Sequence, residues 1–107
     1  MKNKRLRQIR AEIMRIKLKL QRIGDMRPGS LTVQYRNPEK RIGPFHQISY
    51  THKMKSRTEY VRPIFVKKIK LEITAYKRFK ILVQRWSDLA LEQSKLRVNI
   101  AKNKKSE

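Results

Sequence analysis

The first part of the chain shows an unbroken alternation of three- and four-residue steps between apolar side chains. Such steps place the side chains on one stripe of an α-helix, and a sustained alternation of this kind is typical of a coiled-coil seam. Gly24, directly after the run, is a residue that favours the position just beyond a helix C-terminus, so the pattern predicts a helix over residues 3–23. The stripe consists of Leu6, Ile9, Ile13, Ile16, Leu20 and Ile23.

A second and longer apolar run follows Pro63, which suits the first turn of a helix because its missing N–H has no intrahelical acceptor there. No Gly or Pro interrupts the run afterwards, and Gln93 is the one polar step in its stripe. The pattern predicts a helix over residues 63–102, roughly 60 Å long at 1.5 Å per residue, and then a polar tail over residues 103–107. The stripe consists of Ile69, Ile73, Tyr76, Phe79, Val83, Trp86, Leu89, Leu96 and Ile100.

Between these two runs the period of the pattern changes from that of a helix to that of a strand. Residues 31–36 alternate between apolar and polar side chains, and residues 44–51 and 56–61 are rich in aromatic residues, Thr and Val. Three short strands are therefore expected. Residues 52–55, between the second and third strands, contain neither Gly nor Asn. A tight two-residue turn is for that reason not expected there, and a looser hairpin or a bulge is.

The expected fold is α+β, in a single domain over residues 1–107. Its two helices would form a long antiparallel helical hairpin of coiled-coil type, with a small antiparallel sheet of two or three strands inserted over residues 24–62. At about 28 Å the first helix can cover only half of the second. We expect the uncovered seam to lie near Trp86–Ile100, and exposed apolar seams usually mark association. A homodimer and docking on a larger protein partner both stay open.

Composition narrows the class of protein further. The chain has 107 residues and a formal net charge of +21, from 29 Lys and Arg against 8 Asp and Glu. So large a charge opposes compaction unless anions bind, and the common polyanions are nucleic acid and anionic membrane. There is no cysteine, so disulfides and cysteine-based zinc sites are excluded, and no cofactor is expected. No segment reaches the roughly 20 apolar residues of a membrane span, and the charged start is unlike a secretory signal. A cytoplasmic location is the expectation, and membrane binding is disfavoured because the helices have narrow seams.

Residues of the types that enzymes use for catalysis are not grouped in the sequence. The eight acids are spread singly along the chain, and His46 and His52 cannot make a closed metal site alone. Tyr35, Tyr50 and Tyr60 stand among Arg and Lys, as the nucleophile of a tyrosine recombinase does, but sheet tyrosines are more often packing residues. We therefore expect a protein that is not an enzyme.

Basic residues fall on three expected elements that a polyanion would contact. A two-stranded ribbon can enter the major groove of DNA, and the predicted hairpin has bases near its tip. Bases on the helices would contact phosphates without reading sequence. Aromatic residues of the sheet would stack on bases if the target were single-stranded, although packing is the preferred interpretation for Phe45 and Ile48. The candidate binding residues are Arg7, Arg10 and Arg15 in the first helix, Arg36, Lys40, Arg41, Lys53, Lys55 and Arg57 in the insert, and Lys67, Lys70, Lys77 and Arg78 in the second helix.

A set of short motifs lies in the central segment of the chain. They are Pro28-Gly29-Ser30-Leu31, Gln34-Tyr35-Arg36, Gly43-Pro44-Phe45, and Tyr50 with Lys53, Lys55, Arg57, Thr58, Tyr60 and Val61. Over residues 26–94 the chain resembles an uncharacterised family, a domain of unknown function found in short basic bacterial and archaeal proteins often encoded near mobile-element genes. Many of those relatives have a cysteine cluster where this chain has residues 37–42, and a glycine where it has Met54. The resemblance implies the fold and a mobile-element context, and no activity or metal role.

Two functions remain after these exclusions. The preferred one is non-catalytic binding of nucleic acid, with DNA favoured and RNA open, as an accessory factor of a mobile element or a nucleoprotein. The alternative is a structural or assembly subunit that docks or oligomerises through its apolar seams, including within an RNA–protein complex.

Overall fold

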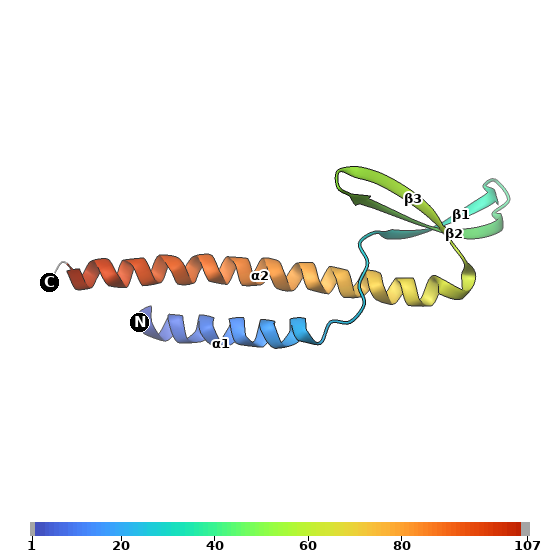
Figure 1. Ribbon diagram of the computed structural model, residues 1–107. Coiled ribbons are helices and arrows are strands. Elements are labelled where there is room, and N and C mark those ends of the chain that lie inside the picture. Colours follow the sequence, from blue (N-terminus) through green and yellow to red (C-terminus); the bar gives the residue numbers. More distant parts are fainter. Residues whose placement is uncertain (1, 106–107) are drawn as a thin grey trace. The chain divides into compact units, whose positions relative to one another are not determined.

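The computed structural model describes residues 2–105 of the chain and confirms a mixed α+β fold, in which a three-stranded antiparallel sheet lies between two helices in the sequence. The elements in order are α1 (Lys2–Gln21), β1 (Ser30–Asn37), β2 (Ile42–His52), β3 (Lys55–Val61), a short 3₁₀ helix (Pro63–Phe65) and α2 (Val66–Lys105). Figure 1 shows these elements with the same labels. The chain divides into two compact units, one of residues 1–23 and 79–107 and one of residues 24–78.

The first unit is built by α1 and the later turns of α2. Its buried cluster consists of three isoleucines of the predicted seam and Leu89 of α2, and both Ile9 and Leu89 are fully buried. The residues of the predicted seam are thus the ones that α1 buries. The last turn tightens to 3₁₀ geometry, because Arg22 N–H donates to the Lys19 carbonyl and Ile23 N–H donates to the Leu20 carbonyl, both at 3.1 Å.

Polar contacts between α1 and α2 flank this cluster. As the residue number of the α1 partner increases, that of the α2 partner decreases. Lys2 donates to Asn99, Arg5 pairs with Glu92, and Glu12 pairs with Arg85. The Arg5 guanidinium makes two hydrogen bonds to Glu92, at 2.5 and 2.8 Å. This fork geometry orients the two side chains more strictly than a single bond would. The predicted helical hairpin and its coiled-coil character stay predictions.

The expectation that the seam near Trp86–Ile100 is uncovered is wrong. Leu89 is fully buried against α1, and Trp86 and Leu96 pack on the same cluster. The short first helix covers the later part of α2, and the sheet packs on its beginning. The buried stripe of α2 also differs from the predicted one by one residue at its centre. Leu82 packs against the cluster, whereas Val83, which was predicted to belong to the stripe, is 37% exposed.

In the second unit the sheet has strand order β1-β2-β3, with both neighbouring pairs antiparallel. Its core consists of Ile48, Val61 and Ile73, on β2, β3 and α2. Leu31, Tyr50, Val66 and Ile69 pack around them. A short link leads into β1 through Gly29, where φ is +138° and an added Cβ would lie 2.9 Å from the Ile48 side chain. Only glycine therefore fits at this position without displacing the core.

The turn between β2 and β3 is tighter than expected. His52 pairs with Lys55, so Lys53 and Met54 alone make the turn, with φ of +50° and +65°. Positive φ at both central residues is the signature of the primed hairpin turns, which match the twist of the strands they join. The looser hairpin or bulge expected from the sequence is wrong, because strand twist determines the turn despite the unfavourable residue types.

The start and end of α2 differ slightly from the prediction. The chain enters through one 3₁₀ turn at Pro63–Phe65, and Arg62 before it makes no side-chain capping bond. The helix continues to Lys105, so residues 103–105 of the predicted tail are helical, and residues 106–107 lie outside the described residues. None of the helices in the described part of the chain is long and apolar enough to cross a membrane.

Candidate nucleic-acid interface

The register of the sheet divides its side chains between two faces. Leu31 lies opposite Ile48, and Ile48 lies opposite Glu59, so these residues share the face that packs on α2. Side chains alternate along a strand, so the neighbours of these residues point to the other side. We call this opposite side the outer face. It consists of Thr32, Gln34 and Arg36 from β1, Phe45, Gln47, Ser49 and Thr51 from β2, and Ser56, Thr58 and Tyr60 from β3.

The helix-facing side holds one polar network. Tyr50 donates to Glu59 at 2.6 Å, Arg27 donates to the other Glu59 oxygen at 2.7 Å, and the Arg27 guanidinium lies 5.4 Å from the centre of the Tyr50 ring. The backbone N–H of Arg27 also donates to the Glu72 carbonyl in α2. Arg27 thus ties the link before β1 to both the sheet and the helix. Its contacts occupy the one carboxylate of β3.

This network shifts the titration of its members in opposite directions. The hydrogen bond from Tyr50, and then that from Arg27, lower the pKa of Glu59, because both stabilise the carboxylate. The same bond raises the pKa of Tyr50, because a phenolate there would face the carboxylate. At neutral pH Glu59 is therefore ionised and Tyr50 is protonated, so the network needs no further counter-charge.

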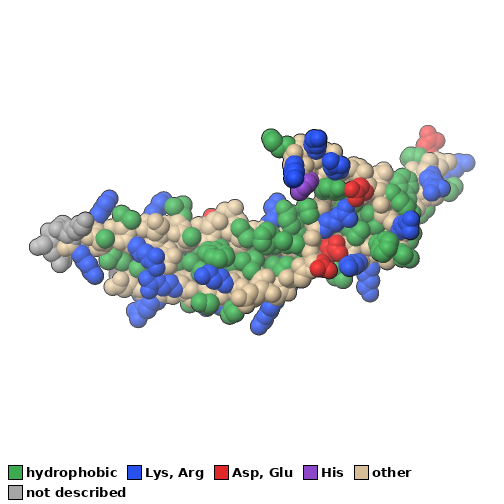
Figure 2. All heavy atoms as spheres, in the orientation of Figure 1, with side chains coloured by type: hydrophobic (Ala, Val, Ile, Leu, Met, Phe, Trp, Pro, Cys, Tyr) green, Lys and Arg blue, Asp and Glu red, His purple; other side chains and the backbone are tan. Residues whose placement is uncertain are grey.

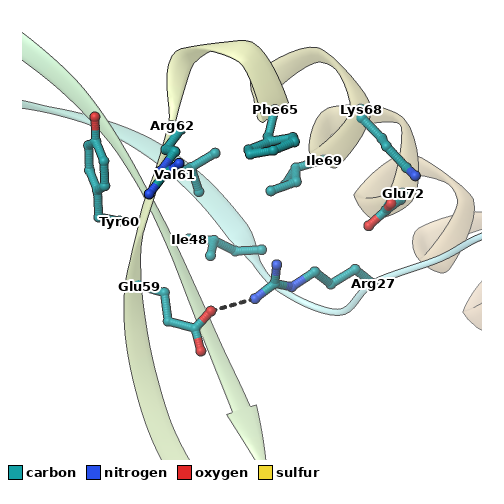
Figure 3. A pocket seen from close by; sticks show the side chains of 10 residues that line it. All are labelled: Arg27, Ile48, Glu59, Tyr60, Val61, Arg62, Phe65, Lys68, Ile69 and Glu72. Carbon is teal, nitrogen blue, oxygen red and sulfur yellow. Dashed lines mark hydrogen bonds and ion pairs between the residues drawn. The ribbon is translucent and has the colours of Figure 1, made fainter.

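Two of the hollows in the second unit are lined by candidate or network residues. The first, of about 470 Å³, is lined among others by Arg27, Glu59, Phe65 and Glu72, and Figure 3 shows its side chains. The second, of about 460 Å³, lies where β1 and β2 meet α2. Its lining includes Lys70, Lys77 and His46, with Ile73 as part of the floor. Two of the candidate helix bases thus line the same hollow as a histidine, which sequence spacing did not indicate.

The outer face is hydroxylic and contains one aromatic pair. The side-chain hydroxyl oxygens of Ser49 and Thr58 lie 3.2 Å apart across the strands, and those of Thr51 and Ser56 lie 3.4 Å apart. The ring centroids of Phe45 and Tyr60 are 6.4 Å apart with the planes at 49°. The preferred packing interpretation is therefore correct for Ile48 and wrong for Phe45, which lies on the side of the sheet away from the core. The period of two gives the reason, since residues three apart on a strand point to opposite faces.

The candidate bases of the insert lie at the two ends of the sheet. Arg36, Lys40 and Arg41 lie at the turn between β1 and β2, and Lys53 and Lys55 lie at the turn between β2 and β3. These turns are separated by the 11 residues of β2, about 33 Å at the usual rise of a strand. Arg57, opposite Tyr50, lies near the second turn. The insert therefore presents two basic ends and not one basic tip.

The remaining candidates lie on the helices. Lys67, Lys70, Lys77 and Arg78 belong to the part of α2 in the second unit, and Arg7, Arg10 and Arg15 lie on α1 in the first. Arg10 lines a groove of about 370 Å³ together with Met14, Lys17, Trp86 and Arg97. In that groove the Lys17 ammonium lies 5.3 Å from the centre of the Trp86 ring, within the range of a cation–π contact.

All thirteen candidates are exposed, and within residues 2–105 none of them belongs to an ion pair. Four of the acids are instead paired with other bases: Glu12 with Arg85, Asp25 with Lys68, Glu59 with Arg27, and Glu92 with Arg5. Residues 24–78 have 13 bases against 4 acids, a charge of +9, and the residues of the first unit have 16 against 4, a charge of +12. Figure 2 shows Lys and Arg side chains scattered over the visible surface with few acids among them.

The arrangement is suited to binding an anion. No group of three or more His, Cys, Asp or Glu that could hold a metal ion occurs in the described part of the chain. Sequence reasoning identified the bases but missed Tyr60 and Phe45 as a pair, and combining the strand period with the register would have found them. In comparisons with known proteins, no protein-family model, curated protein or solved structure matches the chain.

Proposed function

We propose that the protein binds nucleic acid without catalysing a reaction, and that DNA is its target in preference to RNA. The supporting observation is that, within residues 2–105, four acids pair with Arg5, Arg27, Lys68 and Arg85, while the thirteen candidate bases are exposed without an ion-pair partner. The two small units have net charges of +9 and +12, so the basic side chains within each unit repel one another. Binding a polyanion relieves that repulsion. The resemblance to small basic proteins encoded near mobile elements supports the role of an accessory factor and belongs to the same proposal.

The experiment is a salt series with duplex DNA, single-stranded DNA and structured RNA. Each phosphate contact contributes about 0.9 to the slope of log K against log[salt] on duplex DNA. We expect a steep slope and a preference for DNA over structured RNA that persists at ~200 mM salt. Equal affinity for all three targets that disappears at ~200 mM salt would mean that charge alone acts, and would contradict the proposed preference for DNA.

The hairpin between β2 and β3 provides a mutational test. Replacing Lys53, Lys55 and Arg57 with Ala should weaken DNA binding and reduce the slope by about 3, because up to three phosphate contacts are lost. The matched control replaces Lys95, Lys102 and Lys104 with Ala, which removes the same charge from exposed positions of the first unit. If the two triple variants lose equal affinity, the hairpin has no special role in binding.

A second candidate function is assembly through apolar surface, in which the predicted hairpin of helices would act as a coiled-coil subunit of a larger complex. It is favoured by exposed apolar side chains in the first unit, where large apolar patches often mark partners. They include Met14 at 56% exposed, Ile81 at 69%, Leu91 at 58% and Val98 at 52%. Sedimentation of the isolated chain distinguishes the two functions: assembly predicts oligomers or aggregates, and binding predicts a soluble protein that needs nucleic acid to form larger species.

A further inference from the structure

We propose that the outer face of the sheet binds a single strand of nucleic acid, with unpaired bases stacked on Phe45 and Tyr60. The inference rests on the proposed function and assigns its substrate class and contact surface. The helix-facing side of the same sheet is filled by Ile48, Val61 and Ile73, so the aromatic pair contributes nothing to that core.

Exposure distinguishes these two rings from ordinary packing residues. Tyr60 is 58% exposed and Phe45 is half-buried, and both project from the side of the sheet away from Ile48. Figure 3 shows Tyr60 on the far side of β3 from Ile48 and Ile69. A tyrosine at this exposure keeps much of its ring in water, which leaves a face open to a stacking ligand.

The spacing of the rings fits a strand whose bases are separated. Their centroids lie 6.4 Å apart, close to twice the ~3.4 Å rise per nucleotide of a stacked strand. Two consecutive bases would therefore have to unstack from each other to occupy both rings. A duplex keeps its bases stacked and paired inside, so it offers the rings no base face. Stacking on aromatic side chains is how single strands are held on sheets of other proteins.

Charge on the same face favours a polyanion over a protein partner. No carboxylate belongs to the outer face, because Glu59 of β3 points to the other side and is bonded to Arg27 and Tyr50. The Arg36 side chain lies against Gly43, where an added Cβ would come within 3.1 Å of it, so this base is held on the sheet at the end nearer Phe45. A backbone phosphate beside the stacked bases would meet a cation on the outer face itself, and the acid at this end, Glu39, lies beyond the face in the turn between β1 and β2.

The rest of the outer face supplies hydrogen-bonding groups. Gln47 lies directly between Thr32 and Tyr60 across the three strands, and Gln34 lies opposite Phe45. Amides and hydroxyls both donate and accept, so they can bond the edges of any base. This composition favours binding that tolerates many sequences, since stacking itself discriminates little among bases.

The test measures fluorescence anisotropy of labelled oligo-dT, oligo-U and a duplex with wild-type protein and with Phe45→Leu and Tyr60→Leu. Each ring variant should bind the single strands about tenfold more weakly, the usual effect of losing one stacked base, while duplex affinity stays unchanged. The salt slope should also stay unchanged, because no phosphate contact is removed. Tyr60→Phe retains the ring and should retain wild-type affinity.

Tyr35→Leu is the matched control, because Tyr35 shares its face of the sheet with the core residues and not with the aromatic pair. If Tyr35→Leu weakens single-strand binding as much as Tyr60→Leu does, the outer face has no special role and the inference is overturned. The inference is also overturned if the wild-type protein binds duplex DNA and both ring variants keep wild-type affinity for the single strands. That result would leave the proposed function intact. Wild-type protein that binds no nucleic acid removes both.

A second measurement avoids variants that fold poorly. Iodouracil placed within a single strand is irradiated in complex with the wild-type protein, and the linked peptide is mapped by mass spectrometry. Crosslinks to Tyr60 or Phe45 support the inference. Crosslinks confined to Trp86 or Tyr76, outside the outer face, contradict it.

Discussion

We expect Leu89→Ala to lower the free energy of unfolding of the first unit more than the same substitution at any other leucine of α2. Leu89 is fully buried among Ile9, Ile13 and Ile16 of α1. Truncating a buried leucine removes the transfer free energy of its methyl groups and leaves a cavity, at a cost of ~3 to 5 kcal/mol. At 1.4 kcal/mol per factor of ten, even ~3 kcal/mol lowers the folded-to-unfolded ratio about a hundredfold.

The assay uses the distribution of aromatic residues between the units. Trp86 is the one tryptophan of the chain and packs beside the first-unit cluster, whereas all four tyrosines lie within residues 24–78. Urea unfolding followed by tryptophan fluorescence therefore reports on the first unit, and tyrosine fluorescence reports on the second. We expect Leu89→Ala to lower the urea midpoint of the tryptophan signal more than that of the tyrosine signal.

The matched control is Leu91→Ala, in the same helix and with the same atoms removed. Leu91 is 58% exposed, so its truncation should change the free energy of unfolding by no more than ~0.5 kcal/mol. Equal effects of the two substitutions would refute the assignment of Leu89 to the core. If Leu89→Ala instead altered oligomeric state and left stability unchanged, the seam around Leu89 would be an interface between chains, as the sequence alone had indicated.

Two further predictions concern the sheet and the ion pairs. Met54→Gly should stabilise the second unit by about 1 kcal/mol in urea unfolding, because Met54 has φ of +65° and a side chain 98% exposed with no packing to lose, whereas Met54→Ala keeps the Cβ and should give no gain. The folded-state pKa values of Glu59 and Glu92 are held below the ordinary 4.5 by hydrogen bonds from Tyr50 and Arg5. Their stabilising effect is thus complete above pH ~4.5 and is lost as the pH falls through the lowered values, so melting temperature should be flat from pH 7 to about 5 and fall below that. A melting temperature that rises on acidification would contradict this assignment, and Glu59→Gln should flatten the acid limb of the tyrosine signal.

Periodicity predicted the elements well because each helix and strand has a side that must be buried. The α1 prediction ended two residues beyond Gln21, and the three strands each extended one or two residues past their predicted bounds. The turn at Lys53–Met54 was missed because local residue preference lost to the twist of the flanking strands. The position of α1 along α2 was missed because a heptad pattern specifies which side is apolar and not which partner covers it.

The candidate site was predictable in its charge and not in its geometry. Counting bases predicted the excess of positive charge, but the separation of Arg36 and Lys53 to opposite ends of the sheet follows from the strand register. Phe45 was assigned to the core because aromatic residues in strands usually pack. Its true face follows once Ile48 is known to point at α2, which required the contacts between sheet and helix.

The two faces of the sheet depend on each other through Glu59. A carboxylate on β3 that pointed outward would repel a phosphate, whereas the contacts of Glu59 with Tyr50 and Arg27 hold it on the helix-facing side. These contacts favour the charged form of Glu59 and lower its pKa, so the charge is balanced within the fold. The network that fixes the link before β1 therefore also leaves the outer face free of negative charge, which is the condition for a polyanion to approach Phe45 and Tyr60.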